Sequence, residues 1–313
     1  MSEKEFVTGR CKVCGGELRV PADLKLFSCM YCGAKLTQAD LAETPEPVAP
    51  TGNLAALTEN FTTHMVDCIV NYPDLRMKIS RKEYDVAFEG YERECRAVFE
   101  DLDAAVRMDP SRRDELLAQA IGCFLDQLEA NWAIRKNRRT GLKMMIDDDK
   151  MTMAIFMVPM IGHLNLSISE EFCGRLQKEW VIRHPKSPFY VGSYDAISGG
   201  FRKKWFKFCF ITTAVCEELG KPDDCAELTA FRSFRDSYLL SCPDGQALID
   251  EYYDIAPGIV TCINFCGDRT ERYTAIRDKY LAPCYADLLR GDMAACKERY
   301  TRMVRELERE YLQ

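Results

Sequence analysis

The doubled pair of cysteines near the N-terminus restricts the fold more than any other feature of this sequence. Cys11 and Cys14 are separated by two residues, and after fourteen further residues Cys29 and Cys32 repeat that spacing. A Cys-x-x-Cys turn presents two thiolates to one ion, and two such turns supply the four soft ligands that Zn²⁺ prefers. The spacing therefore predicts one zinc site formed by these four cysteines.

Two glycines and a set of apolar residues support this prediction. Gly15 and Gly33 each follow the second cysteine of a pair, where a left-handed backbone lets amide hydrogens point back at sulfur. Apolar residues between the pairs predict two short strands with a bend at residues 21–23: Leu18, Val20, Leu24, Leu26 and Phe27. The pattern resembles a zinc ribbon of the type found in transcription factors. That resemblance implies a small β-structure over residues 1–41, and a closed site of four thiolates is structural.

The charge of the chain bears on what such a ribbon contacts. Basic and acidic side chains nearly cancel over residues 1–41, and the whole chain has a formal net charge of −7. DNA-binding ribbons are usually more basic, so the balance favours a protein-contacting or stabilising role over a nucleic-acid role. The densest basic cluster, residues 135–143, has two interpretations. It is either an anion or RNA contact or, as we favour, a set of cations at a helix C-terminus.

Cysteine usage indicates the compartment. The chain has 313 residues and 16 cysteines, and its first ten residues contain no apolar signal segment. The most apolar run, residues 151–166, is shorter than the roughly 20 residues that a membrane span needs, and we expect a core helix there. We therefore expect a cytoplasmic protein without a membrane association, in which twelve cysteines are mostly buried thiols.

The rest of the chain predicts helices. Residues 42–53 contain three prolines and should form a linker, after which Thr51 or Asn53 caps a helix from Leu54 to about Tyr72. A capping box, Ser80-x-x-Glu83, begins a long helix that ends near residue 108. Its apolar residues recur at alternating spacings of four and three: Tyr84, Phe88, Tyr91, Cys95, Val98, Leu102 and Ala105. A second helix over residues 112–138 should fold back as an antiparallel hairpin.

Further helices are expected in the second half. They cover residues 169–183 and 201–219, a segment capped by Asp223 or Asp224, and a segment from Pro243 to about Pro257, followed by two more. Residues 147–149, three aspartates, should begin a helix, and residues 186–200 should form a loop. The predicted fold is mainly α: a small N-terminal β zinc ribbon, a linker, then a multi-helix α bundle. We place a helical domain at residues 54–200 and another at 201–313.

Three blocks in the C-terminal domain carry a resemblance to a known family. In order they read Cys209-Phe-Ile-Thr-Thr-Ala, Phe231-Arg-Ser-Phe-Arg-Asp-Ser-Tyr-Leu and Tyr252-Tyr-Asp-Ile-Ala-Pro257. Over about residues 204–262 they resemble the CFI-box C-terminal domain, a bacterial module attached to varied N-terminal partners. The family has no assigned activity, so the resemblance implies a domain and no reaction. The family usually has serine where Ala256 stands, which leaves no role for that hydroxyl here.

The same blocks hold the candidate ligand-binding residues: Arg232, Arg235, Asp236, Tyr252 and Tyr253. The first three lie on one helix face, and with the two tyrosines they form a polar set suited to an anion or a carboxylate. The favoured alternative is an internal ion pair that fixes the helices. A second metal site is a further, weaker hypothesis that draws on five cysteines: Cys216, Cys225, Cys242, Cys262 and Cys266.

No set of residues in the sequence assigns a reaction. Cys209 is a candidate nucleophile, but the chain has only three histidines and none lies in the three blocks, so a small buried side chain is the better interpretation. We therefore expect a cytoplasmic interaction or adaptor protein that binds another macromolecule, in the first place a protein. The alternatives are an enzyme or small-ligand sensor that uses the arginine and tyrosine face, and a nucleic-acid binder that uses the ribbon.

Overall fold

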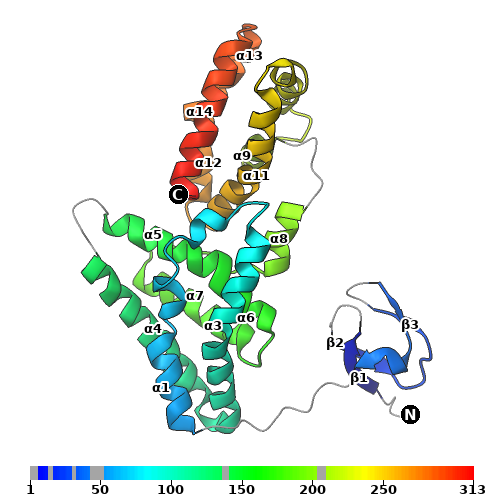
Figure 1. Ribbon diagram of the computed structural model, residues 1–313, viewed down its shortest axis with the longest axis vertical. Coiled ribbons are helices and arrows are strands. Elements are labelled where there is room, and N and C mark those ends of the chain that lie inside the picture. Colours follow the sequence, from blue (N-terminus) through cyan, green and yellow to red (C-terminus); the bar gives the residue numbers. More distant parts are fainter. Residues whose placement is uncertain (1–5, 13–16, 30–32, 43–52, 136–140, 203–208) are drawn as a thin grey trace. The chain divides into compact units, whose positions relative to one another are not determined.

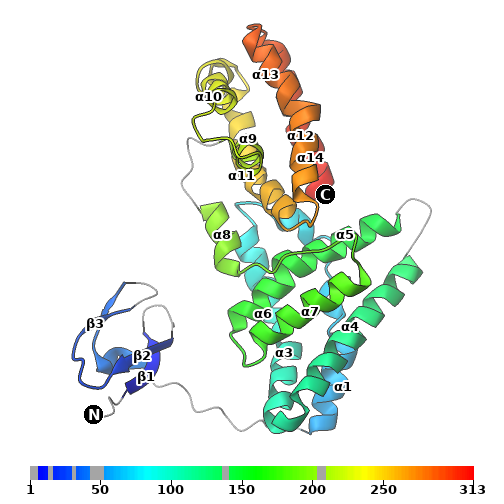
Figure 2. The same ribbon diagram turned by 180° about the vertical axis from the view of Figure 1, so that it is seen from behind.

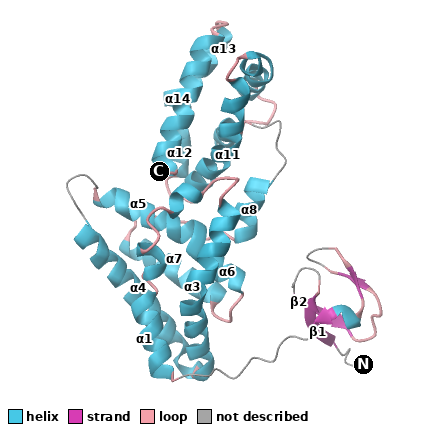
Figure 3. Cartoon of the chain, viewed as in Figure 1, coloured by secondary structure: helices cyan, strands magenta, loops and turns pink. Residues whose placement is uncertain are grey.

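The computed structural model describes residues 6–12, 17–29, 33–42, 53–135, 141–202 and 209–313 (Figure 1). The chain divides into two compact units, Met1–Thr51 and Gly52–Gln313. The first is a small β-structure and the second is built of helices, so the mainly α prediction is confirmed (Figure 3). No helix in the described ranges is both long and apolar enough to cross a membrane. Most of the expected linker, residues 43–52, lies outside the described residues.

The first unit consists of two small antiparallel sheets. Strand β1 (Phe6–Cys11) pairs with β2 (Glu17–Pro21) on one side and with β5 (Leu41–Ala42) on the other. A separate hairpin joins β3 (Phe27–Ser28) to β4 (Lys35–Leu36), followed by the turn η1 (Gln38–Asp40). The sequence predicted β2 and β3 but neither β1 nor β5, because the polar segment before Cys11 has no apolar alternation.

The second unit begins with a set of packed helices. Asn53 caps α1 (Leu54–His64) by accepting a hydrogen bond from the backbone N of Ala55 at 3.0 Å. The single helix expected as far as Tyr72 is wrong, because α1 ends at His64 and the short α2 (Asp67–Val70) follows. Helix α3 (Tyr84–Met108) and α4 (Arg113–Arg135) are joined by the turn η3 (Pro110–Arg112), and α1 packs against both. All predicted apolar residues of α3 are buried.

The capping box predicted for α3 is absent. The backbone carbonyl of Ser80 accepts from the N–H of Tyr84 at 3.0 Å, but the Ser80 hydroxyl has no hydrogen-bond partner. Glu83 instead pairs with Lys78 at 2.7 Å, in the turn η2 (Leu75–Lys78). The nearby lysine therefore takes the carboxylate that would have completed the box.

The apolar segment forms one continuous helical rod, as expected. It comprises α5 (Leu142–Thr152), a π-helical turn η4 (Met153–Met157) and α6 (Val158–Leu164), with α7 (Ser169–Arg183) lying against α6 (Figure 2). The three aspartates lie in the middle of α5 and not at its start. Each pairs with a different cation: Asp147 with Lys150, Asp148 with Arg76, and Asp149 with Arg135. Residues 136–140 of the basic cluster lie outside the described residues, while Arg135 serves this internal ion pair.

Residues 186–200 were expected to form a loop, but they include most of α8 (Tyr194–Arg202). Tyr194 stacks on Phe88 with ring centroids 4.3 Å apart, and the Ser198 hydroxyl donates to Asp85 at 2.7 Å. These buried contacts outweigh the low helix propensity of the glycines in this segment. The expected boundary between residues 200 and 201 falls inside α8.

The remaining helices lie between residues 209 and 313. They are α9 (Phe210–Glu218), α10 (Ala226–Ser233) with the π-helical turn η5 (Phe234–Leu239), α11 (Gly245–Asn264), α12 (Arg269–Ile276) with the π-helical turn η6 (Arg277–Leu281), α13 (Ala282–Leu289) and α14 (Met293–Tyr311). The helix predicted over residues 201–219 is wrong, because the backbone of Cys209 is not helical. Neither Asp223 nor Asp224 caps α10, since Cys225 occupies that position.

Helix α11 runs through Pro257, where we predicted its end. Proline removes one backbone donor, but the buried residues on both sides continue the packing and hold the helix together. Gly258 allows α11 to approach η2 closely: a Cβ atom there would lie 2.0 Å from the backbone oxygen of Ile79. Gly267 packs in the same way on Pro188, where a Cβ atom would lie 1.9 Å from Cγ. The two halves of the helical unit are therefore in close contact through glycine.

Candidate functional site

Cys29, the first residue of the second cysteine pair, begins a turn that two backbone hydrogen bonds close. The N–H of Cys29 donates to the carbonyl of Ala34 at 2.8 Å, and the carbonyl of Cys29 accepts from the N–H of Gly33 at 2.9 Å. Gly33 has a φ of +74°, the left-handed conformation that the sequence predicts. Cys29 is 2% exposed and belongs to the small core of this unit, with Leu18 and Leu36. The described residues of this turn, Cys29 and Gly33, fit a zinc ligand at Cys29.

The structure describes less of the other three predicted ligands. Cys11 ends β1, but its side chain and the whole of Cys14 and Cys32 lie outside the described residues. Lys12 connects the first pair to the segment that follows β4, because its backbone N–H donates to Asp40 at 3.4 Å and its Nζ to the carbonyl of Ala39 at 2.6 Å. Both pairs therefore belong to one small unit, and these four cysteines are the residues that would hold Zn²⁺.

The second metal site does not form. Among the described side chains, no group of three or more histidines, cysteines or acidic residues could hold a metal ion. Of the five cysteines in that hypothesis, Cys216 and Cys225 approach each other, with their sulfur atoms 3.8 Å apart. Cys262 and Cys266 form separate hydrogen bonds to backbone carbonyls. The spacing of these cysteines along the helices does not bring a third thiol to either pair.

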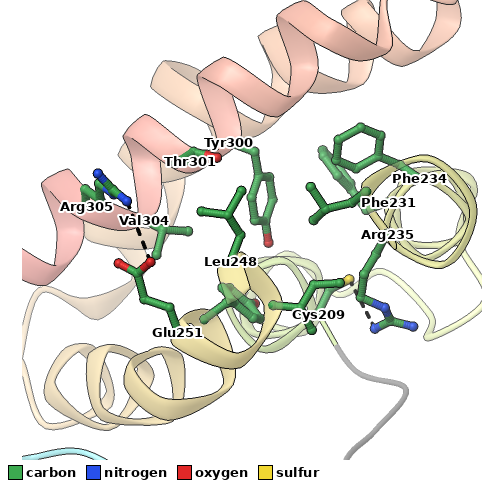
Figure 4. Close-up of a pocket in the computed structure, with 13 residues that line it drawn as sticks. Cys209, Phe231, Phe234, Arg235, Leu248, Glu251, Tyr300, Thr301, Val304 and Arg305 are labelled. Carbon is green, nitrogen blue, oxygen red and sulfur yellow. Dashed lines mark hydrogen bonds and ion pairs between the residues drawn. The ribbon is translucent and has the colours of Figure 1, made fainter. Parts of the chain in front are cut away.

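Arg235 is the centre of the polar cluster in the helical unit (Figure 4). It lies in η5 and is only 7% exposed. Its Nε and Nη2 donate to the two carboxylate oxygens of Asp236 at 2.7 and 2.9 Å, and its Nη1 donates to the Tyr253 hydroxyl at 3.0 Å. The same Nη1 lies 3.9 Å from the sulfur of Cys209. An internal ion pair is therefore present, as favoured, but it lies within η5, and the hydrogen bond to Tyr253 is the contact that joins η5 to α11.

The two other predicted residues point elsewhere. The guanidinium of Arg232 donates to the side chain of Asp223 at 2.6 Å and to its backbone carbonyl at 2.8 Å, in the turn before α10. The hydroxyl of Tyr252 is buried and accepts from the backbone N–H of Ile211 at 3.0 Å, which fixes the start of α9. Three of the five predicted residues, Arg235, Asp236 and Tyr253, thus form one hydrogen-bonded cluster, and the other two each bond elsewhere.

The environment of Cys209 does not favour a nucleophile. Burial raises the pKa of its thiol to about 11, although the charge of Arg235 opposes this rise. The thiol is therefore protonated at neutral pH. The three histidines pair with carboxylates far along the chain from Cys209: His64 with Asp67, His163 with Glu92 and His184 with Glu129. A buried thiol without a neighbouring base is a packing residue.

An apolar pocket lies beside this cluster, between α11, α14 and η5 (Figure 4). It encloses about 580 Å³ of empty space, its open mouth included. The lining residues are Cys209, Phe231, Phe234, Arg235, Leu239, Leu248, Ile249, Glu251, Tyr252, Tyr300, Thr301, Val304 and Arg305. Sequence reasoning found Arg235 and Tyr252 but missed the side chains of α14. The apolar stripe of α14 was the sequence signal for this side of the pocket, but the many charged residues of the helix favour an exposed position.

The three blocks that carry the family resemblance meet at this place. The first block supplies Cys209 and Ile211, the second Arg235, and the third Tyr252 and Tyr253, and these residues are joined by the contacts given above. Comparison of the chain with protein-family models, with curated proteins and with solved structures gave no match.

Proposed function

We propose that this chain is a cytoplasmic interaction protein whose zinc ribbon binds another protein. The observation that carries the proposal is a pair of exposed leucines on the ribbon. Leu24 is 40% exposed and Leu26 is 62% exposed, and both lie outside the strands in which they were expected. The ribbon fills its own core with Leu18, Val20 and Leu36, so the exposed pair is not needed for folding. Adjacent exposed leucines on a small unit are typical of a protein contact.

The charge around these leucines supports a protein partner over a nucleic acid. Lys25 and Lys35 are exposed, and Asp23 is exposed beside them. Lys12 and Asp40 are engaged in hydrogen bonds within the ribbon. A phosphate backbone is bound by a cluster of free cations, and the described part of the ribbon offers few. We therefore propose an apolar recess on a protein as the surface that the ribbon recognises.

Zinc has a structural role in this proposal. Cys11, Cys14, Cys29 and Cys32 would hold one Zn²⁺ ion and so fix the turn that carries the two leucines. The C-terminal part, similar to the CFI-box domain of bacterial proteins, would act as the helical body to which the ribbon is attached. The protonated Cys209 and the internally paired Arg235 favour binding over catalysis.

The proposal is tested with the full-length protein and the double variant L24S/L26S. Each is used to recover partners from a native lysate, with and without nuclease, and the recovered protein is then purified and titrated directly. Because the substituted side chains are exposed, we expect the variant to keep its zinc and its melting temperature. We expect its affinity for the purified partner to fall by at least about tenfold, the effect of losing one central apolar contact.

A matched control carries the same substitutions on the helical unit. Ile182 and Leu289 are also highly exposed, and I182S/L289S should bind the partner as tightly as the original chain does. Two outcomes would contradict the proposal. One is equal loss of binding in both double variants, and the other is recovery that disappears on nuclease treatment in the unmodified protein.

A further inference from the structure

The apolar pocket opens beside a second, wider cavity on the same helices. The second cavity is a shallow groove of about 1200 Å³, with the open space above it included. Its lining residues are Tyr238, Asp244, Leu248, Ala294, Lys297, Glu298, Thr301, Arg302, Arg305 and Arg309. Leu248, Thr301 and Arg305 line both cavities. The two cavities are therefore neighbours, and a molecule that spans both would pass beside these three side chains.

The inner pocket is apolar. Phe231, Phe234 and Val304 line it and are buried, and Leu248 separates it from the groove. Figure 4 shows Leu248 and Val304 between the helix that carries Tyr300 and the helix that carries Glu251, with Phe231 and Phe234 on the side of Arg235. Each methylene group that leaves water for such a pocket strengthens binding about fourfold. The pocket therefore suits the narrow hydrocarbon end of a ligand.

The outer groove is basic in a chain that is acidic overall. Arg302, Arg305 and Arg309 follow one another along a single face of α14 at spacings of three and four residues. Arg305 lies 3.7 Å from Glu251. Arg302 and Arg309 are exposed, and neither forms an ion pair with any residue in the described ranges.

One of the acidic residues that line the groove forms an ion pair. Asp244 is paired with Lys297, while Glu298 lines the groove. Glu308 lies close to Glu251, and the repulsion between them, with burial as the larger cause, raises the pKa of Glu308. The charges of Arg305 and Arg309 oppose this rise, so Arg309 interacts with Glu308, and Arg302 interacts with Glu306. Both guanidinium groups are nevertheless exposed beside the opening of the apolar pocket.

We propose that these two cavities form one binding site for a single-chain anionic amphiphile. The hydrocarbon chain would occupy the pocket beside Val304, and the carboxylate or phosphate would lie on Arg302 and Arg309. Arginine binds both anions through paired N–H donors, so the groove recognises the shared charge of the two headgroups. This site lies on the helical unit and does not depend on the function proposed for the ribbon.

The test is calorimetric titration of the full-length protein with decanoate, hexanoate and decanol, each below its micelle concentration. We expect decanoate to bind most tightly. Hexanoate has four fewer methylene groups and should bind at least about fiftyfold more weakly, the effect of roughly three buried methylenes. Decanol lacks the charge and should bind at least about fivefold more weakly, since a hydrogen bond to a charged group is the stronger kind. No detectable binding of decanoate at millimolar concentration would overturn the proposal.

Substitutions in the groove and the pocket test whether decanoate binds there. The exposed pair R302Q/R309Q should weaken decanoate binding by about tenfold or more, the worth of two charge-assisted hydrogen bonds, and leave decanol binding unchanged. R96Q/R112Q, which alters two arginines on α3 and η3, is the matched control and should change neither. Leu248→Glu should abolish binding of both ligands, with Leu289→Glu as its control. Unchanged decanoate affinity in R302Q/R309Q or in a folded Leu248→Glu variant would refute the assignment.

Vesicles distinguish the source of the amphiphile. If phosphatidylglycerol vesicles capture the protein and decanoate displaces it, the site takes a lipid from a membrane. If decanoate binds and the vesicles do not, the site takes a free amphiphile. Either result supports a site for an anionic headgroup with a hydrocarbon chain. Vesicle binding that persists with excess decanoate and in R302Q/R309Q would locate the interaction elsewhere and count against the proposal.

Discussion

Replacement of Gly258 by alanine gives the sharpest test of how the helical unit is held together. Gly258 lies in α11, and a Cβ atom added there would lie 2.0 Å from the oxygen and 3.1 Å from the carbon of the Ile79 carbonyl. Both partners are backbone, so neither a rotamer change nor a flexible chain end can relieve the overlap. The helix must move by about 1 Å, and such overpacking lowers the free energy of unfolding by about 1–3 kcal/mol or more.

Alanine also stabilises the helix itself, and this effect opposes the loss of stability from overpacking. In a helix interior it stabilises by about 0.5–1 kcal/mol relative to glycine. We therefore expect a net loss of about 2 kcal/mol for Gly258→Ala. With a denaturant dependence of about 2–3 kcal/mol per molar, this loss lowers the urea midpoint by about 0.7–1 M. Circular dichroism at 222 nm follows the transition, because the signal comes mainly from the helical unit.

Gly122 provides the matched control. It lies within α4, and a Cβ atom there would meet nothing within 4 Å. Gly122→Ala should therefore raise the free energy of unfolding by about 0.5–1 kcal/mol. The two substitutions are chemically identical and should change stability in opposite directions. A Gly258→Ala protein as stable as the original, or more stable, would show that α11 and the η2 turn are not in close contact.

Three further predictions concern single side chains. Because the folded pKa of Cys209 is about 11 against an ordinary value of 9.0, its thiol should react with iodoacetamide at least about tenfold more slowly than the half-buried Cys242 at pH 7.5. Equal reaction rates of the two thiols would contradict the burial of Cys209. The stability that the protonated form of Cys209 contributes is complete below pH 9 and falls as the pH rises towards 11. Mass spectrometry should find one zinc ion per chain. The Cys29→Ser variant should lose this ion while its helicity is unchanged. A Cys29→Ser protein that still contains zinc would refute the ligand assignment. Tyr252→Phe leaves a buried backbone N–H of α9 without its acceptor and should destabilise by about 1–3 kcal/mol, whereas Tyr190→Phe, at an exposed position, should have no effect on the melting temperature.

The parts of the fold that the sequence predicts well depend on local periodicity. The apolar stripe of α3 and a continuous helix from residue 151 to residue 164 are both present, because a helical repeat needs only near neighbours to be recognised. The left-handed Gly33 follows from the same kind of local argument. In each case the residues that decide the structure lie within a few positions of one another.

The errors arise where distant contacts override a local signal. The loop expected before residue 200 is helical because Tyr194 and Ser198 pack on α3, more than 100 residues earlier in the chain. Pro257 lies within α11 because the residues around it are buried in a helix that packs on α8, α9 and α14. Ser80 and Glu83 form no capping box because Lys78 provides a closer partner. None of these partners could be identified from the segment itself.

The candidate site shows the same division. Arg235 and Tyr252 were found because they lie in short polar and aromatic blocks. The basic face of α14 was missed, since charges on a helix are normally exposed and only the apolar pocket beside them gives them a possible role. A pocket formed by helices about fifty residues apart has no signature in a single stretch of sequence.

The three consecutive aspartates of α5 have a consequence for how this chain can change in length. Successive residues of an α-helix point about 100° apart, so three neighbours face three directions. Asp148 and Asp149 accordingly bind Arg76 and Arg135 from two other elements, and Asp147 holds the buried Lys150. Insertion or deletion of one residue before Asp147 rotates Asp148 and Asp149 away from their partners at once, while Asp147 and Lys150 move together. This helix should therefore be fixed in length across any set of sequences that share the fold, while its individual residues vary.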